Sequence, residues 1–142
     1  MITFTNCKVF DGTYNELKNV NVTVEGERIS TVSDAPAAPG SETIDCGGRV
    51  LMPGMIDAHV HVYALSLNVT EAQGFPNTLT PHHARAMMGD ALERGFTTLR
   101  DTGGADWGLW LAIEQGLITA PRLYYCGRGI SQTSGHLDMR HQ

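Results

Sequence analysis

The stretch Val50-Leu-Met-Pro-Gly-Met-Ile-Asp-Ala-His-Val-His61 decides the fold class of this chain. Its apolar residues predict a β-strand over Leu51–His59. Because successive side chains of a strand point to opposite faces, Asp57, His59 and His61 are expected on one face. Two imidazoles whose Cα atoms lie about 7 Å apart can bind one metal ion. An isolated His-x-His triplet can equally be a pair of surface histidines on an edge strand, so the surrounding sequence has to decide.

Short apolar runs follow this stretch and alternate with helical patterns. Strands are predicted at Thr97–Arg100 and Arg122–Cys126. The order strand, helix, strand, helix, strand is typical of a parallel sheet or barrel with right-handed crossovers. In such barrels the carboxyl ends of the strands carry the active site. The first of the three strands therefore places both histidines where a catalytic site is expected.

Two helices are predicted between these strands. The first begins at Thr80-Pro81, where a capping hydroxyl precedes a proline at the first helical position, and it ends at Gly95. Its apolar stripe consists of Ala84, Met87, Met88, Ala91 and Leu92. The second helix runs from about Asp106 to Gly116. Its two tryptophans, Trp107 and Trp110, are expected in the core.

The first fifty residues have a different pattern, with apolar and polar residues in alternation. Three such runs, separated by Gly-bearing turns, cover Ile2–Phe10, Asn19–Val24 and Arg28–Ser33. This period of two predicts antiparallel hairpins that form one sheet with one buried face. Glu42–Cys46 can add another strand. A sheet of this size is too small to be a stable domain alone.

Composition and charge exclude several classes of protein. The chain has 142 residues and a formal net charge of −5, and no run of Lys or Arg could neutralise a nucleic-acid backbone. No stretch approaches the roughly 18 apolar residues of a membrane helix, and the first residues do not read as a signal peptide. Cys7, Cys46 and Cys126 are odd in number and far apart along the chain. They predict reduced thiols in a cytoplasmic protein rather than a disulfide framework.

With these elements in place, the stretch from Val50 to His61 resembles the first-strand signature of the amidohydrolase superfamily. The resemblance covers the full length of the chain, since these enzymes often begin with strands of a small β-sandwich before a distorted (β/α)8 barrel. It implies an α/β fold in which residues 1–50 are part of a β-sandwich domain and residues 51–142 contain the first three barrel strands. It also implies that His59 and His61 bind one or two divalent metal ions, with zinc expected.

Two later segments are similar to the dipeptidase and carboxypeptidase-like branch of the superfamily, which includes prolidase-type enzymes and ochratoxin-degrading amidases. They are Gly95-Phe-Thr-Thr-Leu-Arg-Asp-Thr-Gly-Gly104 and Gly129-Ile-Ser-Gln-Thr-Ser-Gly-His-Leu-Asp138. The implied activity is hydrolysis of the amide bond in N-acyl or aminoacyl amino acids. A cyclic amidase or a deaminase would be expected to share the His-x-His run but to lack the Ser-Gln-Thr-Ser-Gly-His segment.

Three further side chains are candidates for the site because of this resemblance. His136, in the polar loop, is a candidate for binding the carbonyl or carboxylate of the substrate, and the alternative is an exposed loop histidine. Asp57 and Asp101 are expected to contact and orient the metal-binding residues without binding the metal themselves. For Asp101 the alternative is a structural pair with Arg100 or a carboxylate that stabilises a turn.

The rest of a hydrolytic site is not expected within this chain. A closed eight-stranded barrel takes about 250 residues, so only three strands fit. The superfamily's later ligands and its general base are expected beyond Gln142, since two histidines fall short of the three protein ligands of a catalytic zinc. The remainder of the barrel is thus an expected partner, a homo-oligomer is implied, and this chain alone is expected to be inactive. The alternative is a non-catalytic fragment that serves as an assembly module.

Overall fold

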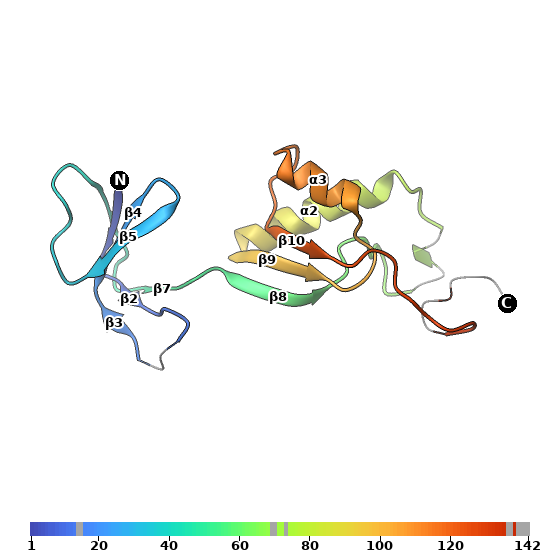
Figure 1. The fold of residues 1–142 in the computed structure, drawn as a ribbon, viewed down its shortest axis with the longest axis horizontal. Helices are drawn as coiled ribbons and strands as arrows, with labels where there is room; N and C mark the ends of the chain where they lie inside the picture. Colours follow the sequence, from blue (N-terminus) through green and yellow to red (C-terminus); the bar gives the residue numbers. More distant parts are fainter. Residues whose placement is uncertain (14–15, 69–70, 73, 136–137, 139–142) are drawn as a thin grey trace. The chain divides into compact units, whose positions relative to one another are not determined.

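The computed structural model describes residues 1–13, 16–68, 71–72, 74–135 and 138. It divides into two compact units, Met1–Pro53 and Gly54–Gln142. In the first unit, all the regular secondary structure of the described residues is β-strand, whereas in the second unit strands and helices alternate (Figure 1). The chain is therefore a mixed α/β structure, as the sequence predicts.

The first unit contains two sheets. Its strands are β1 (Ile2–Thr5), β2 (Lys8–Val9), β3 (Lys18–Asn19), β4 (Asn21–Glu25), β5 (Arg28–Ser33), β6 (Glu42–Asp45) and β7 (Val50–Leu51). One sheet has the order β5-β4-β1-β6 and the other the order β3-β2-β7. The hairpin of β4 and β5 turns at Gly26, whose φ of 58° suits glycine, and is antiparallel as predicted.

The prediction of one antiparallel sheet in this unit is wrong in two respects. The run Ile2–Phe10 is not one strand, because Asn6 has a φ of 51° and turns the chain between β1 and β2. The two halves therefore join different sheets. In addition, β1 pairs with β6 and β2 pairs with β7 in parallel. The grouping of this unit as part of a β-sandwich domain stays a prediction.

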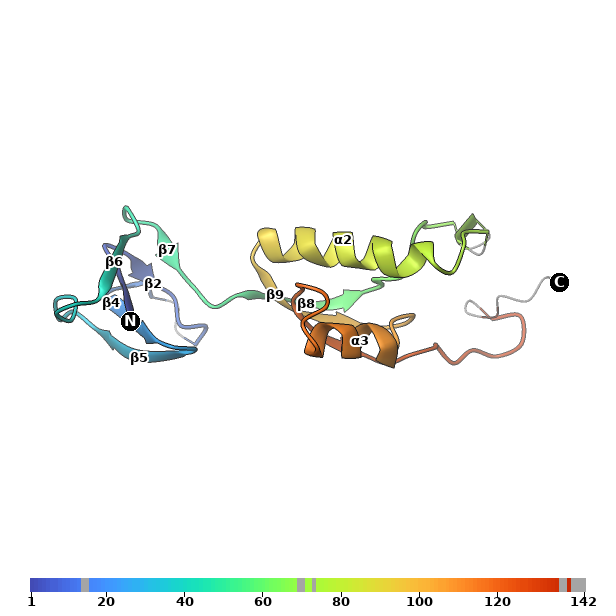
Figure 2. The same ribbon diagram turned by 90° about the horizontal axis from the view of Figure 1, so that it is seen from above.

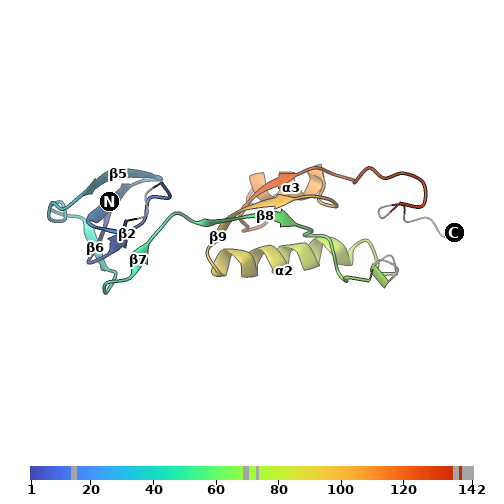
Figure 3. The ribbon, with the colours of Figure 1, turned by 90° about the horizontal axis from the view of Figure 1, so that it is seen from below.

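The second unit is a three-stranded parallel sheet with two crossover helices. Its elements are β8 (Met55–Val60), α2 (Leu79–Glu93), β9 (Phe96–Asp101), α3 (Trp107–Glu114) and β10 (Arg122–Tyr125). The strand order is β10-β9-β8, and both pairings are parallel. Figure 1 shows both helices on one face of the sheet. In the views from above and from below, one helix is seen on each side of the strands (Figures 2 and 3). The predicted alternation of strands and helices is confirmed.

The core of this unit lies between the sheet and the two helices. Val60, Leu99 and Leu123 contribute one buried side chain from each strand. From the helices, Ala84 and Met88 of α2 and Leu109 of α3 complete the cluster, with Val62 and Ala105 from the loops. Burial of such side chains is the main stabilising contribution in a small unit. Side chains that neighbour these buried residues along a strand therefore point to the face of the sheet opposite to the helices.

The first predicted barrel strand is shorter than the sequence indicated. Of the predicted range Leu51–His59, only the part from Met55 onward lies in β8, whereas Val50–Leu51 forms β7 and pairs with β2. Pro53 has no N–H to donate to a sheet, which favours an interruption here. Gly54 lies so close to Thr97 that a Cβ atom would overlap its side chain. This close approach explains the glycine.

The helix positions are largely as predicted, but two details are wrong. α2 begins one residue before Thr80, and its N-cap is Thr78, whose side chain makes no capping hydrogen bond. The end of α2 before Gly95, with its φ of 90°, is as predicted. In α3, Asp106 is the N-cap and accepts a hydrogen bond from the N–H of Leu109. Trp107, expected in the core, is 62% exposed, because Leu109 faces the core instead.

Candidate metal centre

His59 and His61 lie at the carboxyl end of β8, on either side of the buried Val60. Because Val60 packs into the core beneath the helices, its two neighbours project from the other face of the sheet. The centroids of the two imidazole rings are 5.3 Å apart, and the ring planes are inclined by 82°. Both residues are exposed. The two imidazoles are therefore adjacent and accessible to an ion.

The loop after β9 fixes the orientation of one of these rings. His61 Nδ1 lies 3.0 Å from the carbonyl oxygen of Gly103. Because a carbonyl oxygen only accepts hydrogen bonds, Nδ1 must carry the proton and donate it. The lone pair of His61 Nε2 then remains available for a metal ion. In metal-binding histidines, the ring nitrogen that does not bind the metal usually donates a hydrogen bond to a carbonyl or carboxylate oxygen in this way.

Asp57 does not share the face of the two histidines, contrary to expectation. It pairs with Leu99 while Val60 pairs with Asp101, so the register shifts between these two positions. From Asp57 to Val60 the chain advances three residues along β8, whereas the paired residues of β9 advance two, as in a β-bulge. The side chain of Asp57 therefore lies on the same face as that of Val60, opposite to the two histidines. Asp57 is half-buried, and its Oδ1 accepts a hydrogen bond from the backbone N–H of His59 at 3.1 Å. This hydrogen bond lies at the irregularity in the strand register and holds the backbone of His59.

Asp101 is a buried carboxylate that joins two loops. It is 1% exposed, and its Oδ2 accepts a hydrogen bond from the N–H of Val62 at 2.8 Å. Its Oδ1 accepts from the N–H groups of Gly103 and Ala105, at 2.9 and 3.1 Å. The carboxylate thus has the turn-stabilising contacts that were one of the two alternatives for it. Through Gly103 it also holds the carbonyl that binds His61.

Tyr63 is a residue of this region that the sequence did not single out. Its hydroxyl donates a hydrogen bond to Oδ1 of Asp106, the N-cap of α3, at 3.3 Å. Burial, together with the negative charges of Asp106 and Asp101, raises the pKa of Tyr63 to about 12. The hydrogen bond ties the loop after the histidines to α3. The sequence could have singled out Tyr63 only by its position two residues after His61.

A recess of about 430 Å³ at the sheet was also missed by the sequence. It is lined by Arg100, Thr102, Tyr124, Tyr125 and Cys126. Thr102 Oγ1 is buried, and within the part of the chain that the structure describes it has no hydrogen-bond partner. The residues sit at the ends of β9 and β10, and their separation along the chain explains why no sequence pattern joined them.

His136 lies outside the described residues, so its predicted role as a substrate ligand stays a prediction. Of the histidines on α2, His82 is exposed and His83 is half-buried. Among the described residues, no group of three or more His, Cys, Asp or Glu side chains could hold a metal ion. The described part of the chain thus brings two ligands together, His59 and His61.

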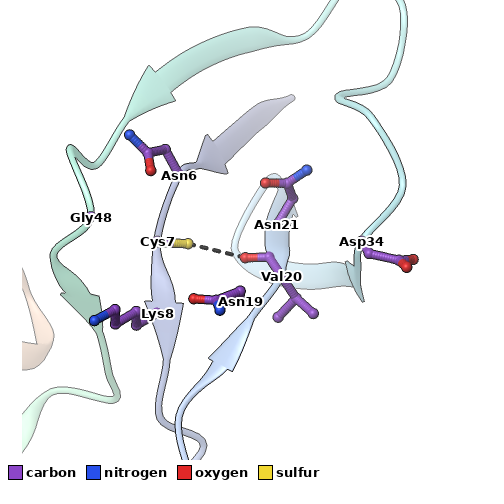
Figure 4. Close-up of a pocket in the computed structure, with 8 residues that line it drawn as sticks. All are labelled: Asn6, Cys7, Lys8, Asn19, Val20, Asn21, Asp34 and Gly48. Atoms are coloured by element: carbon purple, nitrogen blue, oxygen red, sulfur yellow. Dashed lines mark hydrogen bonds between the residues drawn. The ribbon is translucent and has the colours of Figure 1, made fainter.

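Another recess, of about 290 Å³, lies in the first unit and contains none of the predicted site residues (Figure 4). It is lined mainly by polar residues of β2, β4 and the segments beside them: Asn6, Cys7, Lys8, Asn19, Val20, Asn21, Asp34 and Gly48. Figure 4 shows the sulfur of Cys7 directed at the carbonyl oxygen of Val20. None of the described residues that line it is a histidine, and neither His59 nor His61 belongs to it.

Comparison with known proteins identifies the family of this chain. A family model of the amidohydrolases matches residues 50–141. The chain belongs to the amidohydrolase family. Among the described residues of this amidohydrolase chain, no helix is long and apolar enough to cross a membrane.

Several relatives and solved structures resemble this amidohydrolase chain. The ochratoxinase of Aspergillus niger is 34% identical over 93 residues, which cover 63% of this chain and 19% of that protein. The adenine deaminase of Moorella thermoacetica is 33% identical over 110 residues, which cover 76% of this chain and 16% of the relative. A prolidase complexed with N-methylphosphonate-L-proline has a TM-score of 0.89 and 40% identity, covering 98% of this chain and 35% of that one. The chain thus spans at most about a third of these relatives.

Proposed function

We propose that this chain supplies the first two metal ligands of a hydrolase that cleaves the amide bond of N-acyl or aminoacyl amino acids. The single observation that carries the proposal is the pair of adjacent imidazoles, with rings 5.3 Å apart, at the carboxyl end of a parallel strand. In barrels built from such strands, that end is where active sites lie. We further propose that β8, β9 and β10 are the first three strands of a (β/α)8 barrel.

The residues present fit a divalent metal ion. The hydrogen bond from His61 Nδ1 to Gly103 leaves Nε2 available, and the adjacent ring of His59 is exposed on the same face. Neutral imidazoles are common ligands of zinc, and we propose one or two zinc ions here. When bound, such an ion would polarise the amide carbonyl and activate the attacking water. Further ligands and the general base are proposed to come from the rest of the polypeptide.

The chain's own residues have positioning roles in this proposal. His59 and His61 hold the ion, and the Asp57 carboxylate supports the backbone of His59. Asp101 fixes the loop whose carbonyl orients His61. Such supporting contacts are worth about 10-fold to 100-fold in metal affinity or activity in comparable sites. His136 is proposed to bind the carbonyl or carboxylate of the substrate.

The names of the relatives favour an acyl amino acid substrate. A prolidase with a bound phosphonate derivative of L-proline is 40% identical over nearly all of this chain, and the ochratoxinase is also similar. A second candidate is a deaminase or cyclic amidase, which the similarity to the adenine deaminase favours. A non-catalytic assembly module is the third. A cytoplasmic homo-oligomer that binds neither nucleic acid nor membranes completes the proposal.

Metal analysis and a substrate panel test the proposal on the intact protein. We expect zinc to bind at stoichiometric levels, and His59→Ala or His61→Ala to lower the bound zinc and to reduce hydrolysis of N-benzoyl-L-proline by about 100-fold or more. His82→Ala, which removes an exposed histidine of α2, is the matched control and should change neither. Adenine and hydantoin in the same panel test the second candidate. Zinc binding that does not depend on either histidine would contradict the proposed metal site. The non-catalytic assembly module would then be the remaining candidate function.

A further inference from the structure

Arg100 and Tyr124 lie opposite each other on two neighbouring strands of the second unit. They are paired in the parallel register of β9 and β10, and each follows a buried core residue, Leu99 or Leu123. Because side chains alternate along a strand, Arg100 and Tyr124 point to the face of the sheet opposite to the helices. A cationic side chain and a phenol therefore share the face from which the two histidines of the candidate metal centre project.

The recess of about 430 Å³ that these two residues line adjoins the candidate metal centre. Thr102 also lines the recess, and its N–H donates a hydrogen bond to the carbonyl oxygen of Val60, between the two histidines, at 3.0 Å. The carbonyl oxygen of the next residue, Gly103, accepts the hydrogen bond from His61 Nδ1 at 3.0 Å. A small molecule that is bound at the histidines therefore has the recess directly beside it.

The recess has a cationic side chain and no acidic one among the described residues that line it. Besides Arg100, these residues are Thr102, Tyr124, Tyr125 and Cys126. Arg100 is exposed, and within the described part of the chain it forms no ion pair. The adjacent carboxylate, that of Asp101, instead accepts hydrogen bonds from three backbone N–H groups. The guanidinium of Arg100 is therefore available to an anionic ligand.

We propose that Arg100, assisted by the hydroxyl of Tyr124, binds the carboxylate of the amino acid part of the substrate, an inference that rests on the proposed function. A guanidinium can donate two parallel hydrogen bonds to one carboxylate, and a phenol hydroxyl can donate a third. With the amide bond at the histidines, the carboxylate occupies the recess beside them. This assigns the carboxylate to Arg100 and leaves the carbonyl to His136. Substrates with a free carboxylate are then preferred over the corresponding carboxamides.

The test is calorimetric binding of two probes, N-acetyl-L-proline and N-acetyl-L-prolinamide, to the intact protein. The probes differ in the carboxylate alone, and we expect the wild type to bind the acid about 30-fold more tightly than the amide. Arg100→Gln should weaken binding of the acid by about 30-fold and binding of the amide by less than about 3-fold, with unchanged metal content. Arg94→Gln, which removes an exposed guanidinium at the end of α2, is the matched control and should bind both probes as the wild type does.

Two milder variants keep the test decisive if far-ultraviolet circular dichroism shows that Arg100→Gln is not folded. Arg100→Lys retains the charge but not the two parallel donors, so it should bind the acid about 10-fold more weakly than the wild type. Tyr124→Phe removes one hydroxyl and should weaken binding of the acid by about 3-fold. Neither change should alter binding of the amide.

Two results would overturn the proposal. The first is a preference for the acid that persists in the Arg100 variants, because the carboxylate would then be bound elsewhere, for example by the metal ion. The second is an equal loss of affinity for both probes, because Arg100 would then have a structural role. The binding measurement needs no hydrolysis. An intact protein that binds the acid through Arg100 but hydrolyses no N-acyl amino acid would contradict the proposed hydrolase and support the carboxylate site.

Discussion

Asp101 connects the loop after β8 to the loop after β9 through three hydrogen bonds from backbone N–H groups. A carboxylate is suited to this task because it only accepts hydrogen bonds and offers two oxygens. An amide of the same shape has one oxygen and one donor, so an N–H group of the backbone would face another donor. Buried groups left unpaired in this way are costly.

We therefore expect Asp101→Asn to lower the free energy of unfolding by about 2–4 kcal/mol, as measured by urea denaturation. The matched control is Asp90→Asn, which removes the exposed partner of Arg94 on the surface of α2. That change should cost less than about 1 kcal/mol. Equal losses in the two variants would show that the three hydrogen bonds of Asp101 contribute little.

Tyr63 gives the molecule a pH dependence in the alkaline range. Its pKa is about 12 in the folded chain, against an ordinary value of 10.0, because burial and the charge of Asp106 disfavour the phenolate. A raised pKa means that the folded state holds the proton more tightly than the unfolded state. Its contribution to stability is therefore complete below pH 10 and is lost as the pH rises toward 12.

Tyr63→Phe should accordingly flatten the loss of stability between pH 10 and pH 12, when the free energy of unfolding is measured at several pH values. Below pH 9 the variant should be slightly less stable than the wild type, because it lacks the hydrogen bond to Asp106. An unchanged slope above pH 10 would contradict the assignment. Tyr124→Phe, on the exposed part of β10, is the control and should keep the wild-type slope.

Among the elements, α2 contains a glycine that its helix does not require. Gly89 lies within α2, and a Cβ atom there would meet nothing within 4 Å. Gly95, just after the helix, has a φ of 90°, which side chains rarely adopt. The first glycine is a weak point in a helix, whereas the second is required by the turn into β9.

Gly89→Ala is expected to raise the free energy of unfolding by about 0.5–1 kcal/mol, because alanine loses less backbone entropy in a helix. Gly95→Ala should lower it by at least about 1 kcal/mol, because the turn would be strained. Thermal denaturation of the two variants beside the wild type measures both effects. A destabilised Gly89→Ala would show that this side of α2 is covered in the protein.

The whole molecule should respond to metal if the two histidines bind it. An ion that binds only the folded state stabilises it by about 2.7 kcal/mol when its free concentration is 100 times the dissociation constant. A chelator should therefore lower the Tm of the intact protein, and added zinc should restore it. The double variant His59→Ala/His61→Ala should show neither response. A Tm that is insensitive to chelator in the wild type would count against the site.

How far the sequence could predict this molecule differs between its two units. The repeated order of strands and helices after Gly54 was predictable, because each element carries its own period of apolar residues. The sheets of the first unit were not, since pairing between β1 and β6 or between β2 and β7 joins segments about 40 residues apart. The turn at Asn6 has no apolar pattern of its own, so nothing in the sequence divides Ile2–Phe10.

The sequence by itself determined the two histidines, the mixed α/β class and the family, because these depend on residue type and local period. The tertiary structure alone decided the direction of the side chains that support the site. A register shift put the side chains of Asp57 and His59 on different faces of the sheet, and the fold directed three backbone N–H groups at Asp101. Each of these depends on which distant backbone lies alongside, and a linear pattern does not contain that information.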